Sequence, residues 1–237
     1  MAFSPEETRR YARHLVLRGI GGVGQQQLKA ARMLVVGAGG LGSPVIAYLA
    51  AAGVGTIGVV DDDRVSLSNL QRQVIHTTAM AGTAKTESAR QFAAALNPFV
   101  RVVPHETRLG AGNAAELIAN YDLVLDGTDN FATRKMVATA CEATGKPLVS
   151  GAVSMFDGQV TVFAPGGPDF SALYPDDLEE ADLPACEVVG VLGAVTGVIG
   201  TLMAMEAIKL TAGLGEPLIG RLLLYDGRAA RFTELSY

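Results

Sequence analysis

The chain has 237 residues, of which 49% are hydrophobic, and a formal net charge of −5. This length supports one sizeable core, and no internal stretch has the composition of a linker, so we expect a single domain. The acidic balance, without a basic run, disfavours nucleic acid and anionic membranes as partners. Two cysteines, Cys141 and Cys186, without a secretory signal at the N-terminus, favour a reducing cytoplasm and argue against a structural disulfide.

The N-terminal segment begins with the pattern of a capped helix. Ser4 stands at the N-cap, Pro5 at the first position and Glu7 where a capping box needs a carboxylate. We expect this helix to run to about Leu17. By composition, its basic side chains form a solvated face. They are Arg9, Arg10, Arg13 and His14.

A strand, a glycine-rich turn and a helix follow. Leu34 to Val36 is a β-branched run that ends in the sequence GAGGLG at residues 37–42, and Val45 to Ala52 has helix-forming composition. The next strand, Thr56 to Val60, closes on Asp61 at about the spacing at which a βαβ unit presents a carboxylate to a ribose. This unit should bind a nucleotide.

Each glycine of the turn has a physical reason. Gly37 permits the tight turn, Gly39 and Gly40 let backbone N–H groups approach phosphate oxygens, and Gly42 lets helix and strand pack closely. The alternative is a glycine-rich turn without a ligand, since the six-residue pattern also arises by chance. The ordinary ligand of such a loop would be NAD.

The remaining elements predict an α/β fold. Helices are expected over Thr83 to Leu96, from Asn113 through Ile118, and over Phe131 to Thr144 with Gly145 as its cap. Strands are expected over Val100 to Val103 with Pro104 at its end, Asp122 to Asp126, and Pro147 to Ser150. Strands that alternate with helices predict a parallel sheet.

The pattern changes from Gly151 onward. Phe156-Asp157-Gly158-Gln159 and Tyr225-Asp226-Gly227-Arg228 have the composition of hairpin turns, so the sheet should finish with antiparallel strands. The expected fold is therefore Rossmann-like, with a mainly parallel sheet, helices on both faces and antiparallel strands at its end. Its parts are N-terminal helices in 1–30, a nucleotide-binding half in 32–150, and a C-terminal half in 151–237.

Two segments of the C-terminal half need separate interpretation. Residues 164–187 are rich in proline, glycine and acid without periodicity, which is typical of a long, mobile crossing loop. Val188 to Met205 is uncharged and about as long as a membrane span. Its glycines and threonines make it weakly apolar, and it lacks a flanking aromatic belt, so we expect a buried helix at the core or at a dimer interface.

The polar residues around the nucleotide-binding unit suit ATP better than NAD. A triphosphate needs more cations than the diester phosphates of NAD, whose charge is largely met by loop amides. Here Asp61-Asp62-Asp63 leads into residues 66–73, Lys85 opens the next helix, and Thr128-Asp129-Asn130 ends a later strand. Without this context Lys85 would be a solvated helix-start lysine, although cations do not favour a helix N-terminus.

At these residues the chain resembles a known family. The sequences GAGGLG, DxDxVxxSNLQRQ and TDN, together with Lys85, are similar to the ubiquitin-activating-type superfamily, in particular to bacterial MoeB/ThiF sulfur-carrier adenylyltransferases. The likeness runs from about Glu7 to Phe232. It implies ATP-dependent adenylation of the C-terminal glycine of a small ubiquitin-like carrier protein (MoaD- or ThiS-like). This adenylation, which releases pyrophosphate, would activate the carrier for sulfur transfer in molybdopterin, thiamine or thiolated tRNA biosynthesis.

The resemblance assigns roles to residues. It implies that Gly40 lines the phosphates, Asp61 binds the ribose, residues 68–72 wrap the nucleotide, Lys85 meets the phosphates, and Asp129-Asn130 completes a Mg²⁺–ATP site in which Asp129 is the metal ligand. The candidate nucleotide-binding residues are Gly37, Gly39, Gly40, Gly42, Asp61, Asp63, Ser68, Asn69, Leu70, Gln71, Arg72, Gln73, Lys85, Asp129 and Asn130. The candidate catalytic residues are Arg13, Arg72, Lys85, Asp129 and Cys186.

The implied reaction needs no general base, because the attacking carboxylate is already ionised. The task is to neutralise phosphate charge and to hold the reacting groups in line. The three histidines, His14, His76 and His105, are accordingly interpreted as structural. Asp129 could also cap the helix that begins at Phe131.

Further implications concern partners. In the family, the second arginine of R-Y-x-R reaches the ATP of a neighbouring subunit, and Arg10-Tyr11-Ala12-Arg13 matches, which predicts a homodimer.

Some members use a cysteine at the position of Cys186 for a covalent adduct, although Asp182 and Glu187 would raise the pKa of its thiol. Close relatives bind zinc through two C-x-x-C pairs; Phe170 and Leu173 stand where the first would fall, so we expect no zinc. Without a rhodanese-like extension, sulfur should come from a separate donor protein.

Two other functions stay open at this point. One is an NAD-dependent oxidoreductase, and the other is a non-catalytic or heterodimeric binding partner of the same fold.

Overall fold

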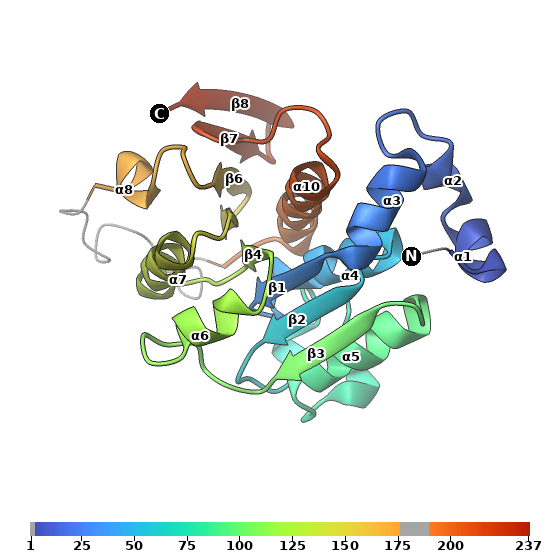
Figure 1. Cartoon of the computed structure of the whole chain (residues 1–237). Coiled ribbons are helices and arrows are strands. Elements are labelled where there is room, and N and C mark those ends of the chain that lie inside the picture. Colours follow the sequence, from blue (N-terminus) through green and yellow to red (C-terminus); the bar gives the residue numbers. More distant parts are fainter. Residues whose placement is uncertain (1–2, 176–189) are drawn as a thin grey trace.

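A single mixed sheet organises the protein, which was analysed as a computed structural model that describes residues 3–175 and 190–237 (Figure 1). Its eight strands have the order β3-β2-β1-β4-β5-β6-β7-β8. The first five strands of this order are parallel, and the pairs from β5 to β8 are antiparallel. The strands are β1 (Arg32–Val36), β2 (Thr56–Val60), β3 (Arg101–His105), β4 (Leu123–Asp126), β5 (Leu148–Ser154), β6 (Asp157–Phe163), β7 (Arg221–Asp226) and β8 (Arg231–Ser236). The expected fold class is confirmed.

Helices cover both faces of this sheet. They are α1 (Pro5–Arg10), α2 (Ala12–Leu15), α3 (Gly21–Ala30), α4 (Gly42–Ala52), α5 (Lys85–Leu96), α6 (Ala114–Ala119), α7 (Phe131–Thr144), α8 (Phe170–Leu173) and α10 (Gly193–Ala212), with short 3₁₀ turns η1 (Leu67–Asn69) and η2 (Thr78–Met80). Met33 and Val35 of β1 join a core with α3, α4, α5 and α10, whereas Leu34 and Val36 join a second core with α6, α7 and α8. Because successive side chains of a strand point to opposite faces, β1 is buried on both sides.

The N-terminal helix starts as expected but ends early. Ser4 Oγ accepts from the backbone N–H of Glu7 and the Glu7 carboxylate accepts from Ser4 N–H, so the capping box is confirmed. The prediction of one helix to Leu17 is wrong, because Tyr11 (φ −94°, ψ 12°) interrupts it. The Tyr11 ring is buried, and its hydroxyl accepts a hydrogen bond from Asn97 Nδ2 at 2.9 Å.

Several other boundaries differ from the predicted ones. β3 continues through Pro104, which an edge strand tolerates because one of its sides needs no ladder hydrogen bonds. Asn113 stands at the N-cap position of α6 as expected, but its side chain makes no capping bond, and its oxygen accepts from Gly110 N–H instead. The β5–β6 turn lies at Met155-Phe156, before the predicted position, and Met155 adopts a φ of +48°. The β7–β8 turn, expected over Tyr225 to Arg228, lies two residues later, at residues 227–230.

The apolar C-terminal segment forms α10, which begins at Gly193, after the predicted start at Val188. By length and composition alone, α10 could span a membrane. In this fold its Val195, Ile199 and Met203 are buried in the core, and a Cβ on Gly200 would lie 2.6 Å from the carbonyl oxygen of Leu41. This close approach of α10 to α4 supports the expected buried helix. Half of the expected crossing loop 164–187, namely residues 176–187, lies outside the described residues.

Candidate active site

The candidate site lies where neighbouring parallel strands end. Gly37 follows β1, Asp61 follows β2, and Gly127 follows β4, and the chain leaves β1 and β4 in opposite directions from the centre of the sheet. Such a switch point leaves a crevice at the carboxyl ends of the strands. A cleft of about 1270 Å³ opens here and continues along β6, β7 and β8.

The glycine turn brings the N-terminus of α4 to the floor of this cleft. Gly37 has a φ of +90°, and its N–H donates to the Val60 carbonyl at 2.8 Å. A Cβ on Gly42 would lie 1.9 Å from the carbonyl oxygen of Gly37, so this position needs glycine for packing. Gly39 and Gly40 line the cleft, where backbone N–H groups and the helix dipole favour an anion.

Asp61 is tied to this turn. One of its carboxylate oxygens accepts from Ala38 N–H at 2.8 Å, and the other accepts from Asp63 N–H at 2.9 Å. Burial raises the pKa of Asp61, while Lys85 and these hydrogen bonds lower it. Each oxygen keeps a free lone pair, so the carboxylate can still accept hydroxyl donors from a ribose.

His76 links the same turn to α5 through two hydrogen bonds. Its Nε2 lies 2.9 Å from the carbonyl oxygen of Ala38, and its Nδ1 lies 2.8 Å from Ser88 Oγ. A carbonyl can only accept, so Nε2 carries the proton and Nδ1 accepts from the serine hydroxyl. Burial lowers the pKa of His76, which keeps it neutral. The structure thus gives His76 the structural role expected from the sequence.

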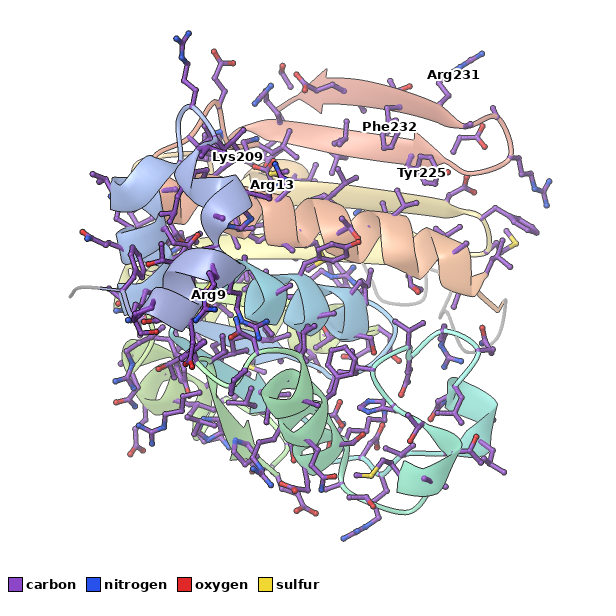
Figure 2. All side chains as sticks on the ribbon, turned by 90° about the vertical axis from the view of Figure 1, so that its right-hand side faces the viewer. Arg9, Arg13, Lys209, Tyr225, Arg231 and Phe232 are labelled. Carbon is purple, nitrogen blue, oxygen red and sulfur yellow. The ribbon has the colours of Figure 1, made fainter. Side chains whose placement is uncertain are left out.

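The cleft brings together most of the residues singled out in the sequence. Those lining it are Gly37, Gly39, Gly40, Asp61, Asp63, Gln71, Arg72, Gln73, Lys85, Asp129 and Asn130. Gly42 is buried in α4, and Ser68, Asn69 and Leu70 lie outside the lining, around η1. Arg13 lies on α2, also outside the lining (Figure 2). Cys186 lies outside the described residues.

The cap of α7 differs from the suggestion that Asp129 provides it. Asn130 Oδ1 accepts from Thr133 N–H at 2.8 Å and is therefore the cap. Asp129 is exposed at the cleft and needs no capping role, so its carboxylate is accessible to a ligand.

Sequence reasoning missed a buried ion pair at the cleft floor. Asp126 is the last residue of β4 and is fully buried, and Arg134 lies in the first turn of α7, 8% exposed. Arg134 Nε lies 3.5 Å from Asp126 Oδ2. The sequence signal was an aspartate at the end of an apolar strand, but the spacing to Arg134 alone does not indicate that they meet.

An aromatic cluster occupies the position where relatives are expected to place the first zinc-binding pair. Phe170 and Leu173 belong to α8 and pack in the core, and Phe170 lies 4.7 Å from Tyr174, 5.6 Å from Phe163 and 5.8 Å from Phe131, centroid to centroid. Tyr174 also accepts a hydrogen bond from Gln159 Nε2, on the cleft wall. Ring packing therefore anchors the start of the crossing segment.

The residues present fit a magnesium-bound nucleoside triphosphate. Lys85 and Arg72 supply cations, Gly39 and Gly40 leave room for phosphates, and Asp129 offers a hard oxygen ligand. Gln73 Oε1 is buried without a hydrogen-bond partner among the described residues, which leaves an acceptor beside the glycine turn. The Asp61, Asp62 and Asp63 carboxylates also lie within 4.8 Å of one another.

A family model agrees with this geometry: residues 11–237 match the ThiF family. The chain belongs to the ThiF family. The resemblance seen at GAGGLG, TDN and Lys85 is thereby confirmed. The match covers the nucleotide-binding half and the antiparallel strands alike.

Curated relatives in the ThiF family include enzymes from bacteria and archaea. The probable adenylyltransferase/sulfurtransferase MoeZ of Mycobacterium tuberculosis is 51% identical over 100% of this chain and 60% of its own length. The sulfur carrier protein adenylyltransferase of Thermus thermophilus is 48% identical over 100% of this chain and 89% of its own. The SAMP-activating enzyme E1 of Haloferax volcanii is 47% identical over 96% and 84%. The chain thus spans 60% of the MoeZ length and most of the other two.

Solved structures agree with the fold. E. coli MccB with ATP matches with a TM-score of 0.84 at 20% identity, over 96% of this chain and 71% of that one. PaaA matches with a TM-score of 0.83 at 20% identity, over 99% and 74%. At this identity the likeness establishes the shared fold alone.

Proposed function

We propose that this chain uses ATP to adenylate the C-terminal carboxylate of a small ubiquitin-like sulfur-carrier protein, with release of pyrophosphate. The observation that carries the proposal is the cleft itself, which places a glycine turn, a buried lysine and an exposed aspartate at the carboxyl ends of parallel strands. The printed names of the Thermus and Haloferax relatives, a sulfur carrier protein adenylyltransferase and a SAMP-activating enzyme, support the substrate class.

In this proposal the chain's residues bind and orient the triphosphate. Gly39 and Gly40 offer backbone N–H groups to phosphate oxygens, Asp61 accepts the ribose hydroxyls, and Lys85 with Arg72 neutralises charge that develops on the leaving pyrophosphate. Mg²⁺ held by Asp129 would screen the phosphates. No proton has to be removed from the attacking carboxylate, which agrees with a cleft whose lining contains no histidine among the described residues.

The second arm of the cleft suits the tail of a carrier. It runs along the antiparallel strands and is lined by Ser154, Gln159, Tyr225 and Thr233. These polar and aromatic side chains can contact an extended peptide whose terminus reaches the phosphates beside Gly40.

We further propose a homodimer in which Arg13 serves the neighbouring site. Arg13 lies outside its own cleft, on the face where α10 and the β7–β8 hairpin are exposed (Figure 2). Large apolar side chains are exposed on α10 and the hairpin, where they include Met205 and Phe232, and directly after α2, where they are Val16 and Leu17. A second copy could cover them, since monomeric proteins rarely expose such surfaces. Sulfur would come from a separate donor protein, in a cytoplasmic setting.

Isotope exchange between pyrophosphate and ATP tests the proposed reaction. An adenylating enzyme incorporates label into ATP when it receives a carrier that ends in Gly-Gly, and it does not do so with a carrier that lacks these residues. A non-catalytic partner and an NAD-dependent enzyme give no exchange with any carrier. Absence of exchange with every candidate carrier of the same genome, by protein that binds ATP, would overturn the proposal.

A further inference from the structure

The buried pair Asp126 and Arg134 holds a single residue of the cleft loop, Thr128. Asp126 Oδ1 accepts from Thr128 N–H at 3.0 Å and from its hydroxyl at 2.6 Å. The Thr128 carbonyl accepts from an Arg134 Nη2 at 3.1 Å, and the same nitrogen lies 3.4 Å from the Gly151 carbonyl. All three polar groups of Thr128 are therefore bound by the two charged partners.

This restraint acts directly beside the exposed carboxylate of the cleft. Thr128 precedes Asp129, and Asn130 follows it as the cap of α7. Asp129 thus stands between two residues whose backbone is held, one by the ion pair and the other by the helix. The backbone that carries its side chain cannot shift unless one of these attachments breaks.

The pair is poorly explained as a stabilising contact. Asp126 Oδ2 and Arg134 Nε face each other at 3.5 Å, and neither has a hydrogen-bond partner among the described residues. Burial raises the pKa of Asp126 against the lowering effect of Arg134 and Thr128. Apolar residues of similar volume often stabilise a core as well as a buried ion pair does, so such a pair is weak evidence for stability.

We propose that Asp126 and Arg134 are positioning residues that preset the Asp129 carboxylate to bind Mg²⁺ together with ATP. The inference rests on the proposed function for the identity of the ligand. Residues behind a metal ligand orient it, and their loss typically costs ten- to a hundredfold in metal affinity. Arg134 borders the cleft, but the residue is 8% exposed and its Nη2 is bonded to the Thr128 and Gly151 carbonyls, so it acts on Asp129 through Thr128.

Calorimetric titration of ATP, with and without Mg²⁺, tests this role without needing a carrier. The ratio of the two ATP dissociation constants measures the coupling between metal and nucleotide. In Arg134→Lys, the ammonium cannot donate to the Thr128 carbonyl with the forked geometry of a guanidinium. We expect the coupling to fall by about tenfold while the ATP affinity without Mg²⁺ stays within about twofold of wild type.

Two further variants separate positioning from general damage. Arg90→Lys makes the same exchange on α5, where Arg90 pairs with Glu87 outside the cleft, and should keep the wild-type coupling. Asp129→Asn should lose the coupling, and the double variant Arg134→Lys/Asp129→Asn should be no worse than Asp129→Asn, because Arg134 acts through Asp129. Wild-type coupling in Arg134→Lys, or a full additional loss in the double variant, would overturn the inference.

Folding is checked by circular dichroism. If Arg134→Lys does not fold, Thr128→Val carries the test, because it removes the hydroxyl donor to Asp126 and keeps both charges. It should also lower the coupling, and wild-type coupling in it overturns the inference. A wild-type protein whose ATP affinity is unaffected by Mg²⁺ overturns it too. The adenylation proposal is tested separately, by isotope exchange in the presence of a carrier.

Discussion

Lys85 Nζ lies 2.8 Å from a carboxylate oxygen of Asp63, although the lysine side chain is 6% exposed and the aspartate side chain 69% exposed. The lysine is therefore held by its surroundings while its partner can move into solvent. Lys85 is the first residue of α5, where the positive end of the helix dipole disfavours a cation. This position agrees with a role of Lys85 in binding an anion.

Lys85→Ala should lower adenylation by roughly 10²–10³, the scale of removing one preorganised group that stabilises charge in a transition state. Pyrophosphate exchange measures the effect, and circular dichroism establishes that the variant is folded. Arg90→Ala, which removes an exposed cation of the same helix outside the cleft, is the matched control and should exchange like wild type. Wild-type exchange in a folded Lys85→Ala variant would exclude the role.

His76 and His105, whose pKa values burial lowers, should make stability depend on pH. Burial lowers the pKa of His76 in the folded state, whereas the unfolded chain takes up a proton near pH 6.5. Above that pH both states are neutral and the full stability is present; below it the unfolded state binds the extra proton, so stability falls as the pH falls. The slope is at most about 1.4 kcal/mol per pH unit for each such group.

Urea unfolding between pH 7.5 and about 5.5 measures this slope. His76→Gln should flatten it, because glutamine can bond Ala38 and Ser88 without titrating. Burial also lowers the pKa of His105, which lies beside Tyr121 away from the cleft. His105→Gln should therefore remove the part of the slope that His105 contributes. An unchanged slope in His76→Gln would show that the histidine is protonated equally in both states.

Cys186→Ser should leave pyrophosphate exchange nearly intact, because adenylate formation uses no thiol. A covalent adduct with the carrier, if the family's cysteine chemistry applies here, would be lost in the same variant and is measured by mass spectrometry under non-reducing conditions. Cys141→Ser serves as the control, since burial raises the pKa of Cys141 to about 12 and keeps it a thiol. Collapse of exchange in a folded Cys186→Ser variant would contradict the separation of the two steps.

Protein purified without chelators should contain no stoichiometric zinc. Two cysteines cannot supply four thiolates, and Phe170 and Leu173 pack in an apolar cluster at the position of the first expected pair. Metal analysis by mass spectrometry checks this. About one zinc per chain would mean that other ligands hold the metal and that the aromatic cluster is not its replacement.

Mixed dimers test the proposed role of Arg13. Arg13→Ala and Asp129→Ala homodimers should each be poorly active. The first lacks a cation that neutralises the charge of the phosphates, and the second lacks a metal ligand. When the two are unfolded and refolded together, about half of the dimers are mixed and half of their sites are intact, so roughly a quarter of wild-type activity should return. Activity equal to the mean of the separate variants, in mixed dimers identified by mass, would place Arg13 outside the neighbouring site.

The sequence by itself determined the elements whose signals are local. The helix Phe131–Thr144 ends at Gly145 in the left-handed conformation, and β2 covers Thr56–Val60, both as predicted, because caps, glycine turns and β-branched runs act within a few residues. The glycine turn and Asp61, which the sequence assigns to one nucleotide site, line one cleft in the structure, since parallel strands end at the same edge of a sheet.

Only the tertiary structure decided the features that depend on partners far along the chain. Tyr11 breaks the N-terminal helix because it reaches Asn97, and Pro104 stays within a strand because β3 lies at the edge of the sheet. The ion pair of Asp126 and Arg134 forms across a strand end and a helix start, and its hold on Thr128 depends on how α7 packs against β4 and β5. Such contacts are set by packing of whole elements, because long-range geometry is not encoded in any short window of residues.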